Sequence, residues 1–313
     1  MTKECDVLII GAGPAGLTAG IYSGRAGLRT LILEKTAAGG QILKADIVEN
    51  YPAFPDGISG FELMEKMKNQ AEKFGVEFIS VEARELRAHS SKLIVVHTNE
   101  AATYSAKAVI LATGANPKAL GIKGEAELTG RGVSYCATCD GPIFRDKEVV
   151  VVGGGDSAVG EALYLTRFVK KLTLIHRRDA LRAAKILQEK LVKNDRVEIR
   201  WDSVPEEILG GPRVSGIKIK NVKTGKEEHI SCDGIFIYVG VEPNTYFLKD
   251  KIKLDGKKFV VTNENMETSQ KGVFACGDGR KNALKQVVTA CAEGALAAYS
   301  CLRYIEESEG NRK

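Results

Sequence analysis

The chain has 313 residues, of which 44% are apolar and 27% charged, an ordinary composition for a soluble protein that excludes a disordered or fibrous chain. The 45 basic and 40 acidic side chains give a net charge of +5, too small an excess to indicate a nucleic-acid partner. No apolar run reaches the roughly 18 to 20 residues that span a bilayer, and the N-terminus has no leader pattern, so we expect a cytoplasmic protein without a membrane partner.

The first predicted elements form a βαβ unit. The sequence CDVLIIGAGPAG predicts a strand and a glycine turn, and a helical stretch and the strand TLILE, ending at Glu34, complete the unit. In this pattern Gly11 permits the tight turn, Gly13 lets the backbone approach a pyrophosphate, and Gly16 lets helix and strand pack closely. Glu34 has the chemistry to accept hydrogen bonds from ribose hydroxyls, and the alternative is a solvated glutamate at a strand end.

A pair of cysteines, Cys136 and Cys139, follows in the sequence GVSYCATCDG. Zinc would need two further ligands at matched spacing, and neither the histidines nor the other cysteines provide them. Two unrelated core cysteines are the second alternative, but the neighbouring residues are polar or small. We therefore predict a redox-active disulfide, beside which Asp140 is a candidate acid for the departing thiolate or a simple turn residue. The remaining cysteines are predicted to be buried thiols: Cys5, Cys232, Cys276, Cys291 and Cys301.

A second βαβ unit repeats the first. The sequence EVVVVGGGDSA leads into a helical stretch, and the strand LTLIH ends at His176. Gly153 lies 142 residues after Gly11, and the same offset places His176 on Glu34 without a gap. The glycine pattern is GxGxxA, with Gly153, Gly155 and Ala158, and the strand end is basic, with His176, Arg177, Arg178 and Arg182. Arginines match the oxygens of a 2′-phosphate, which predicts NADPH here; the alternative is a solvated basic face.

The order of these units predicts a discontinuous first domain. Glycine-containing strand ends at 108–117 and 272–280 bracket the second unit. We predict an α/β fold with two Rossmann-like three-layer nucleotide-binding domains, the second inserted into the first. The first domain comprises 1–116 and 243–313, and the second, the NADPH-binding domain with the dithiol, comprises 117–242. A long amphipathic helix at 281–305 covers the first domain, with its apolar stripe at Val287, Val288, Cys291, Ala295, Ala298 and Leu302.

Two nucleotide sites and a dithiol together indicate a relay: a nicotinamide donor, a flavin, and a disulfide that the flavin reduces. The motifs resemble those of the low-molecular-weight, NADPH-dependent thioredoxin reductases along essentially the whole chain. The resemblance rests on GAGPAG, GGQ at 39–41, VENYP at 48–52, ATGA at 112–115, GRGVSYCATCDG at 130–141, GGGDSAVGEALYL at 153–165, HRRDALRA at 176–183, GVEPNT at 240–245, GVFACGDGR at 272–280 and KQVVTA at 285–290. The CATCD segment between the two nucleotide motifs is the most specific of these.

The resemblance implies the following site residues. FAD is expected at Gly11, Gly13, Gly16, Glu34, Gln41, Asn50, Thr113, Asp278, Gln286 and Val287, and NADPH at Gly153, Gly155, Asp156, Ser157, Ala158, His176, Arg177, Arg178 and Arg182. By similarity Cys139 faces the flavin, Cys136 attacks the disulfide of thioredoxin, and Asp140 is the acid. A homodimer is implied, as is a rotation of the NADPH domain, for which Gly114 and Gly240 are candidate hinges.

The sequence departs from the family pattern at four positions. Gly160 replaces a common glutamate, Leu284 a frequent tyrosine, Cys276 the usual alanine, and Lys285 the arginine before the glutamine. Lysine keeps the charge but loses the planar fork, so the flavin-side contacts near Gln286 are expected to differ from the family pattern.

Several alternatives stay open. In the first alternative the electron donor is NADH or another reductant. In the second the partner is a glutaredoxin-like or peroxidase protein, although the relatives that serve peroxidases carry an additional N-terminal module. A dithiol oxidase would not need a phosphate clamp. A flavin-binding redox sensor would have no use for CATCD.

Overall fold

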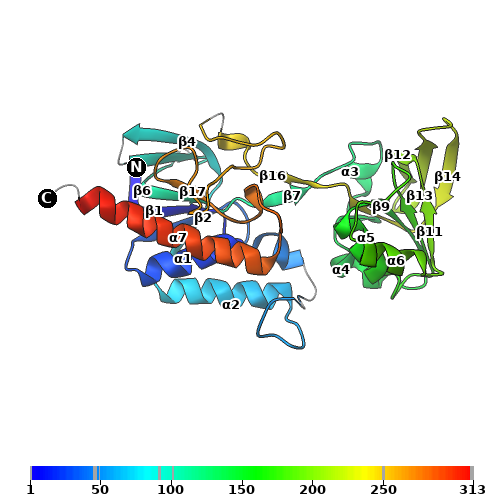
Figure 1. Cartoon of the computed structure of the whole chain (residues 1–313), viewed down its shortest axis with the longest axis horizontal. Helices are drawn as coiled ribbons and strands as arrows, with labels where there is room; N and C mark the ends of the chain where they lie inside the picture. Colours follow the sequence, from blue (N-terminus) through cyan, green and yellow to red (C-terminus); the bar gives the residue numbers. More distant parts are fainter. Residues whose placement is uncertain are drawn as a thin grey trace. The chain divides into compact units, whose positions relative to one another are not determined.

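The computed structural model describes residues 2–44, 48, 50–90, 93–100, 102–248 and 251–310. The chain divides into two compact units (Figure 1): unit 1 is Met1–Asn116 with Glu242–Lys313, and unit 2 is Pro117–Val241. The chain leaves unit 1 through the short strand β7 (Ala115–Pro117) and returns through β16 (Val241–Pro243). These two strands pair with each other as a two-stranded sheet.

Unit 1 is built on a mostly parallel sheet. Its parallel strands are β3 (Glu77–Ser80), β2 (Thr30–Glu34), β1 (Thr2–Ile10), β6 (Thr103–Leu111) and β17 (Val273–Ala275), and β5 (Leu93–Thr98) and β4 (Ala83–Ser90) continue the sheet from β6 as antiparallel strands. Successive residues of β1 point to opposite faces, so Val7 and Ile9 enter one core while Leu8 and Ile10 enter the other. The sheet is therefore covered on both faces.

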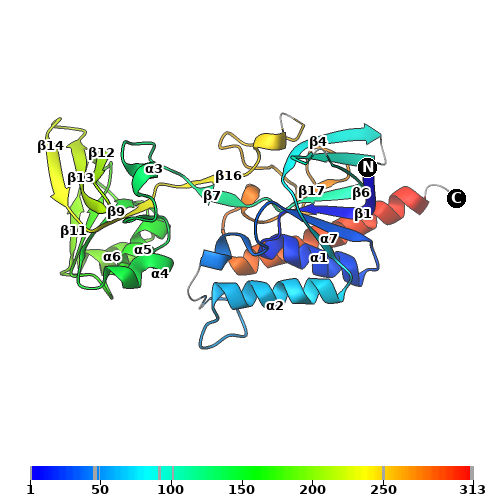
Figure 2. The same cartoon turned by 180° about the vertical axis from the view of Figure 1, so that it is seen from behind.

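Three helices cover one face of this sheet, as both views of the chain show (Figure 2): α1 (Pro14–Arg25), α2 (Gly60–Lys73) and α7 (Val287–Gly310). The 3-10 helices of this unit are η1 (Gly40–Lys44), η3 (Tyr246–Leu248) and η4 (Gly277–Gly279). Helix α7 lies very close to α1, because a Cβ at Gly294 would be only 2.2 Å from the carbonyl oxygen of Ala15. Only glycine permits that approach.

The prediction for the C-terminal helix was wrong in its bounds and at Val288 of its stripe, whereas Val287 and Ala298 are buried and Cys291, Ala295 and Leu302 are partly buried. The helix begins at Val287, not at 281, and it continues to Gly310. Its buried residues are Val287, Ala290, Gly294, Ala297, Ala298, Cys301 and Ile305. Val288, a member of the predicted stripe, is 41% exposed. The buried face was partly misplaced because α7 packs closely against α1 through small residues. Small residues give a weaker hydrophobic pattern in the sequence than valine or leucine.

Unit 2 has three layers of its own. A parallel sheet contains β11 (Val197–Arg200), β10 (Lys171–Ile175), β9 (Glu148–Gly153), β15 (Gly234–Tyr238) and β8 (Val133–Ser134) in that order. An antiparallel layer contains β12 (Ser203–Gly210), β13 (Val214–Asn221) and β14 (Glu227–Ser231). The helical segments are α3 (Glu125–Leu128), α4 (Ala137–Asp140), η2 (Gly141–Phe144), α5 (Asp156–Leu165) and α6 (Lys185–Val192). The predicted α/β class is thus confirmed.

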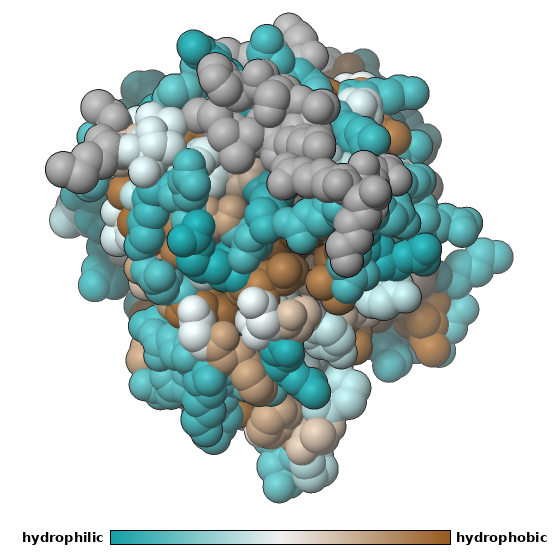
Figure 3. Space-filling view, turned by 90° about the vertical axis from the view of Figure 1, so that its left-hand side faces the viewer, coloured by the Kyte–Doolittle hydropathy of each residue, from teal (hydrophilic) through white to brown (hydrophobic). Residues whose placement is uncertain are grey.

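Figure 3 shows the face of unit 1 that is on the left in Figure 1. Hydrophilic side chains prevail on this face, and hydrophobic ones occur between them in small groups. Within the described ranges, no helix is both long enough and apolar enough to cross a membrane.

Candidate functional site: two glycine turns and a disulfide

The first glycine turn connects β1 to α1 and fits tightly against its surroundings. Gly11 has φ +105°, and a Cβ there would lie 2.3 Å from the carbonyl oxygen of Ala112. A Cβ on Gly16 would lie 1.9 Å from the carbonyl oxygen of Gly11. At Gly13, by contrast, nothing lies within 4 Å of the Cβ position. The start of α1 is therefore open where its free N–H groups attract an anion.

Glu34 is fixed at the end of β2. Its Oε2 accepts a hydrogen bond from the backbone N–H of Ala12 at 2.9 Å, and its Oε1 accepts one from the N–H of Thr36 at 3.1 Å. A cleft opens beside it at the carboxyl ends of the parallel strands, the place where open α/β sheets bind ligands. Its lining is Ile10, Gly11, Leu33, Glu34, Lys35, Val81, Glu82, Ala83, Thr113, Asn244, Tyr246 and Phe247.

A chain of amides extends from the same edge of the sheet. Gln41 Nε2 donates to Asn116 Oδ1, Asn116 Nδ2 donates to Asn244 Oδ1, and Asn244 Nδ2 donates to the carbonyl oxygen of Thr113, each at 2.9 Å. Gln41 and Thr113, predicted from different segments, thus belong to one hydrogen-bonded network.

A second pair of predicted residues also meets. Asn50 Nδ2 donates to Gln286 Oε1 at 2.9 Å, and both residues are exposed. Val287, the next residue, is buried at the start of α7. Residue 49 of the VENYP segment lies outside the described residues.

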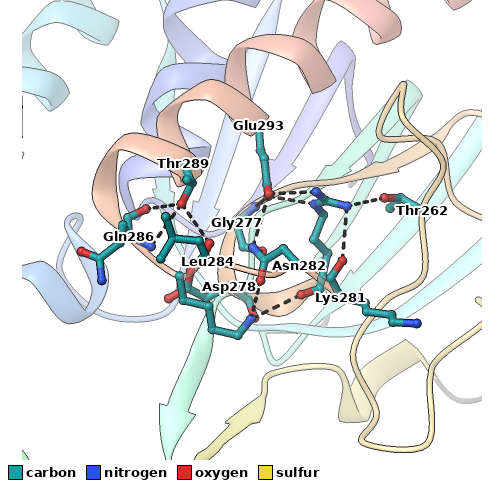
Figure 4. Close-up of polar contacts among 11 residues, drawn as sticks. Thr262, Gly277, Asp278, Lys281, Asn282, Leu284, Gln286, Thr289 and Glu293 are labelled. Atoms are coloured by element: carbon teal, nitrogen blue, oxygen red, sulfur yellow. Dashed lines mark hydrogen bonds and ion pairs between the residues drawn. The ribbon is translucent and has the colours of Figure 1, made fainter. Parts of the chain in front are cut away.

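Asp278 lies in η4, and Figure 4 shows the polar contacts around it. Burial raises the pKa of the Asp278 carboxyl group. Lys285 Nζ donates to the carbonyl oxygen of Asp278 at 2.7 Å and lies 4.3 Å from the centre of the Phe259 ring. Burial lowers the pKa of the Lys285 ammonium group. The loop therefore holds the Asp278 carboxylate and the Lys285 ammonium group in a poorly hydrated place. The attraction between the two charges offsets part of the cost of removing each from water.

The second glycine turn, between β9 and α5, repeats the first. Gly153 has φ +154°, and a Cβ there would lie 2.5 Å from the carbonyl oxygen of Tyr238 and 2.6 Å from the Cβ of Ala158. Nothing lies within 4 Å of the Cβ position of Gly155, which matches Gly13 of unit 1. Asp156 and Ser157 are exposed at the start of α5, and Asp156 Oδ1 accepts a hydrogen bond from the N–H of Ala184 at 2.7 Å.

The residues after β10 separate into one buried and three exposed side chains. His176 is 4% exposed and lies against the turn, since a Cβ on Gly154 would be 2.2 Å from its Nδ1. Burial lowers the pKa of His176. Arg177, Arg178 and Arg182 are exposed, and within the described part of the chain no hydrogen bond or ion pair engages their side chains. These guanidinium groups are thus available to an anion.

The cysteine pair lies at α4. Cys136 is disulfide-bonded, while Cys5, Cys232, Cys276, Cys291 and Cys301 are free thiols, of which only Cys291 is not fully buried. The side chain of Cys139 lies outside the described part of the chain, whereas Asp140 is described and half-buried at the end of α4. The N–H of Cys136 donates to Ser134 Oγ at 3.0 Å, and the N–H of Ala137 donates to Tyr238 Oη at 2.7 Å. The turn that carries the disulfide is therefore anchored from both sides.

Three residues with a place in these sites escaped sequence reasoning. Tyr238 contacts α4 through its hydroxyl group and the Gly153 turn through its backbone. Glu161, on α5, has a buried Oε2 without a hydrogen-bond partner in the described residues, and burial raises the pKa of its carboxyl group. Glu293, on α7, contacts the loop of Asp278. Tyr238 and Glu293 belong to no local motif, because each contacts a segment distant in the sequence, whereas Glu161 lies within GGGDSAVGEALYL without a predicted role.

Two open glycine turns and a disulfide define a class of protein, the nucleotide-dependent disulfide oxidoreductases. Comparison with known proteins gives the same class. Residues 5–294 match the family described as pyridine nucleotide-disulphide oxidoreductase. The chain is 46% identical to the thioredoxin reductase of Treponema pallidum over 306 residues, covering 98% of this chain and 99% of the relative.

Solved structures agree with the sequence relatives. The structure of Lactococcus lactis thioredoxin reductase is similar with a TM-score of 0.87 and 43% identity, covering 97% of this chain and 99% of that one. The thioredoxin reductase of Streptococcus pyogenes has a TM-score of 0.72 and 47% identity, with the same coverage. The chain belongs to the pyridine nucleotide-disulphide oxidoreductase family and, within it, to the thioredoxin reductases. It is a flavin oxidoreductase that also uses a nicotinamide cofactor.

Proposed function

We propose that the chain is an NADPH-dependent thioredoxin-disulfide reductase with FAD as its flavin. Unit 1 binds FAD, and unit 2 binds NADPH and carries the redox disulfide. The main support for the proposal is a difference between the two glycine turns. Glu34 ends β2 beside the first turn, whereas three arginines without a hydrogen bond or ion pair in the described chain follow β10 beside the second. A carboxylate repels a 2′-phosphate, and guanidinium groups bind one.

The residues of unit 1 fit a dinucleotide with a flavin. Gly13 leaves the start of α1 open to a pyrophosphate, and Glu34 lines the adjacent cleft, where its carboxylate would accept hydrogen bonds from ribose hydroxyls. Asp278 and Gln286 would hold the ribitol and the ring. When bound, the flavin accepts an electron pair from the nicotinamide and supplies it to a disulfide.

The thiol chemistry belongs to the chain itself. Once the disulfide is reduced, the Cys136 thiolate attacks a sulfur of oxidised thioredoxin and forms a mixed disulfide, and a thiolate of the partner leaves. Cys139 then attacks Cys136, which restores the disulfide and releases reduced thioredoxin. Asp140 holds a proton for the departing thiolate. The electron pair and one proton come from NADPH, and the second proton comes from solvent.

The other parts of the proposal rest on family resemblance. They are a homodimer, a cytoplasmic location, and a rotation of unit 2 during the catalytic cycle. The alternative that agrees with most of the observations is the same reductase with NADH as donor. It would leave Arg177, Arg178 and Arg182 without a ligand.

An anaerobic titration with NADPH tests the proposal. The flavin and the disulfide each take up one electron pair, so the wild-type protein should consume a second equivalent of NADPH that Cys136→Ser cannot consume. Flavin released by denaturation should be FAD. A wild-type protein that takes up only one equivalent would contradict the role of the disulfide, and equal reduction by NADH at low concentration would contradict the donor.

A further inference from the structure

Glu293 holds the loop 277–282 of unit 1 through one carboxylate (Figure 4). Its Oε2 accepts the N–H of Gly277 at 2.8 Å, and its Oε1 accepts Arg280 Nη2 at 2.8 Å and Asn282 Nδ2 at 3.3 Å. Arg280 Nε also lies 2.8 Å from Oε2, as an ion pair whose N–H is not aligned for a hydrogen bond. Three hydrogen-bond donors and one further guanidinium nitrogen therefore surround the two oxygens.

The ion pair is largely withdrawn from water. The side chains of Arg280 and Glu293 are 15% and 12% exposed. Removing one charge of such a pair is costly, because the other charge stays buried without a counter-charge. Arg280 Nη1 has a further partner, Thr262 Oγ1 at 2.8 Å, but this neutral group cannot replace a carboxylate.

The same loop is held from its other side by Lys285. Its Nζ donates to the carbonyl oxygen of Asp278 at 2.7 Å, to that of Arg280 at 3.4 Å, and to Asn282 Oδ1 at 2.9 Å. Asn282 thus joins the two groups of contacts, since its amide nitrogen donates to Glu293 and its amide oxygen accepts from Lys285. We call Gly277, Arg280, Asn282, Lys285 and Glu293 the loop cluster.

The loop cluster borders the first glycine turn. A Cβ on Gly277 would lie 2.9 Å from the Cβ of Ala15, in the first turn of α1, and a Cβ on Gly279 would lie 3.0 Å from Thr113 Oγ1. Asp278, between these two glycines, is therefore held beside the open start of α1. Gln286 follows Lys285 directly and contacts Asn50. A shift of this loop would move both residues together.

From these contacts we infer that Glu293 is a positioning residue for the flavin: through the N–H of Gly277 and the guanidinium group of Arg280 it sets the place of Asp278 and Gln286. The inference rests on the proposed function, which assigns those two residues to FAD. Glu293 does not touch the flavin itself. Its effect is transmitted by the loop, and so it should appear in flavin binding and in the flavin spectrum.

The test compares Glu293→Gln and Glu293→Asp with the wild-type protein, and Glu307→Gln serves as the control. Glu307 lies on the same helix, is 70% exposed and pairs with Arg303 at 3.7 Å. Glutamine keeps the volume of glutamate but offers one acceptor oxygen and two donors, so it opposes the converging donors. Apoprotein is titrated with FAD, and the visible spectrum and flavin fluorescence are recorded. NADPH binding reports that unit 2 is folded, and thermal unfolding of the apoprotein reports that unit 1 is folded.

We expect FAD to bind at least tenfold more weakly to Glu293→Gln, which corresponds to about 1.4 kcal/mol, with a shifted flavin spectrum and unchanged NADPH binding. Glu293→Asp should lie between this variant and the wild type, and it takes the place of Glu293→Gln if that variant does not fold. Glu307→Gln should match the wild type. FAD binding within twofold of wild type in both Glu293 variants would overturn the inference about Glu293 and leave the proposed function in place. A wild-type apoprotein that binds no FAD would overturn the proposed function together with it.

Discussion

At the scale of single residues, the two nucleotide units differ most in the charge that follows their second strand. Glu34 is held by backbone N–H groups in unit 1, and the side chains of Arg177 and Arg178 extend from unit 2 without partners in the described chain. Because the surrounding turns have the same geometry, this charge difference is the feature that distinguishes a ribose with free hydroxyls from one with a 2′-phosphate.

The arginines can be tested by a double substitution. Arg177→Ala with Arg178→Ala should raise the KM for NADPH by at least tenfold, because hydrogen bonds to charged groups contribute about 1.5–3 kcal/mol each. The KM for NADH should change far less. Steady-state kinetics with both nucleotides measures the difference, and Arg213→Ala, an exposed arginine of the same unit, is the control. An equal effect on both nucleotides would remove the 2′-phosphate from this site.

The role of Cys136 leads to a separate prediction. Cys136→Ser should abolish reduction of thioredoxin and leave FAD bound and reducible, because Cys136 lies in unit 2 while the residues proposed for FAD lie in unit 1. Turnover with thioredoxin and the flavin spectrum are the two measurements. Cys232→Ser, the loss of a buried free thiol in the same unit, should keep its turnover. Retained turnover in Cys136→Ser would exclude it as the attacking residue.

His176 should make the stability of unit 2 depend on pH. Burial lowers its pKa below the ordinary value of 6.5, so the unfolded chain binds the proton first as the pH falls. Its contribution is therefore complete above about pH 6.5 and is lost as the pH falls through the lowered folded-state pKa. The free energy of unfolding of wild type should fall more from about pH 7.5 to about 5.5 than that of His176→Gln. Identical pH dependence in both proteins would contradict this.

At the scale of elements, the two glycine turns share two features. Gly11 and Gly153 have positive φ, and Gly13 and Gly155 are open at the Cβ position. A third position differs: Gly16 is closed by a backbone oxygen, whereas Ala158 packs its methyl group against Gly153. Glycine is thus required for two different reasons in one motif, backbone packing and access for a ligand.

Substitutions at Gly16 and Gly13 test the two requirements, backbone packing and ligand access, separately. Gly16→Ala places a methyl group 1.9 Å from the carbonyl oxygen of Gly11, so α1 must move, and we expect a loss of about 1–3 kcal/mol in stability. Gly13→Ala meets no atom, so its Tm should stay near that of wild type while FAD binding weakens. Thermal unfolding of the apoproteins and FAD titration measure the two effects. A destabilised Gly13→Ala that still binds FAD normally would refute the assignment.

Local signals decided what the sequence could predict about these elements. The two βαβ units have strong signals, since apolar strands, glycine turns and helices follow one another within about 30 residues. The predicted start of helix α7 was wrong because 281–286 contains no glycine or proline to mark a helix boundary, but Lys285 and its carbonyl partners hold this segment as a loop. Tyr238 and Glu293 were unpredictable for a related reason, since their contacts join segments that only the folded chain brings together.

At the scale of the whole molecule, the chain combines two copies of one architecture with different additions. Unit 1 adds the loop cluster at the edge of its sheet, and unit 2 adds the disulfide turn and the arginines. Each addition lies near the carboxyl ends of the parallel strands of its own unit, where a bound nucleotide has its reactive groups. In the proposed function, unit 1 holds the flavin and unit 2 delivers electrons to the disulfide.

The central claim is that electrons pass from NADPH through this chain to the disulfide of thioredoxin. The most direct test follows NADPH absorbance with purified protein, thioredoxin and a terminal disulfide, and repeats the assay without thioredoxin, with NADH, and with Cys136→Ser. We expect rapid consumption of NADPH only when thioredoxin and Cys136 are both present, and much slower consumption of NADH. A yellow protein whose dithiol is reduced by a chemical reductant but by neither nucleotide would contradict it.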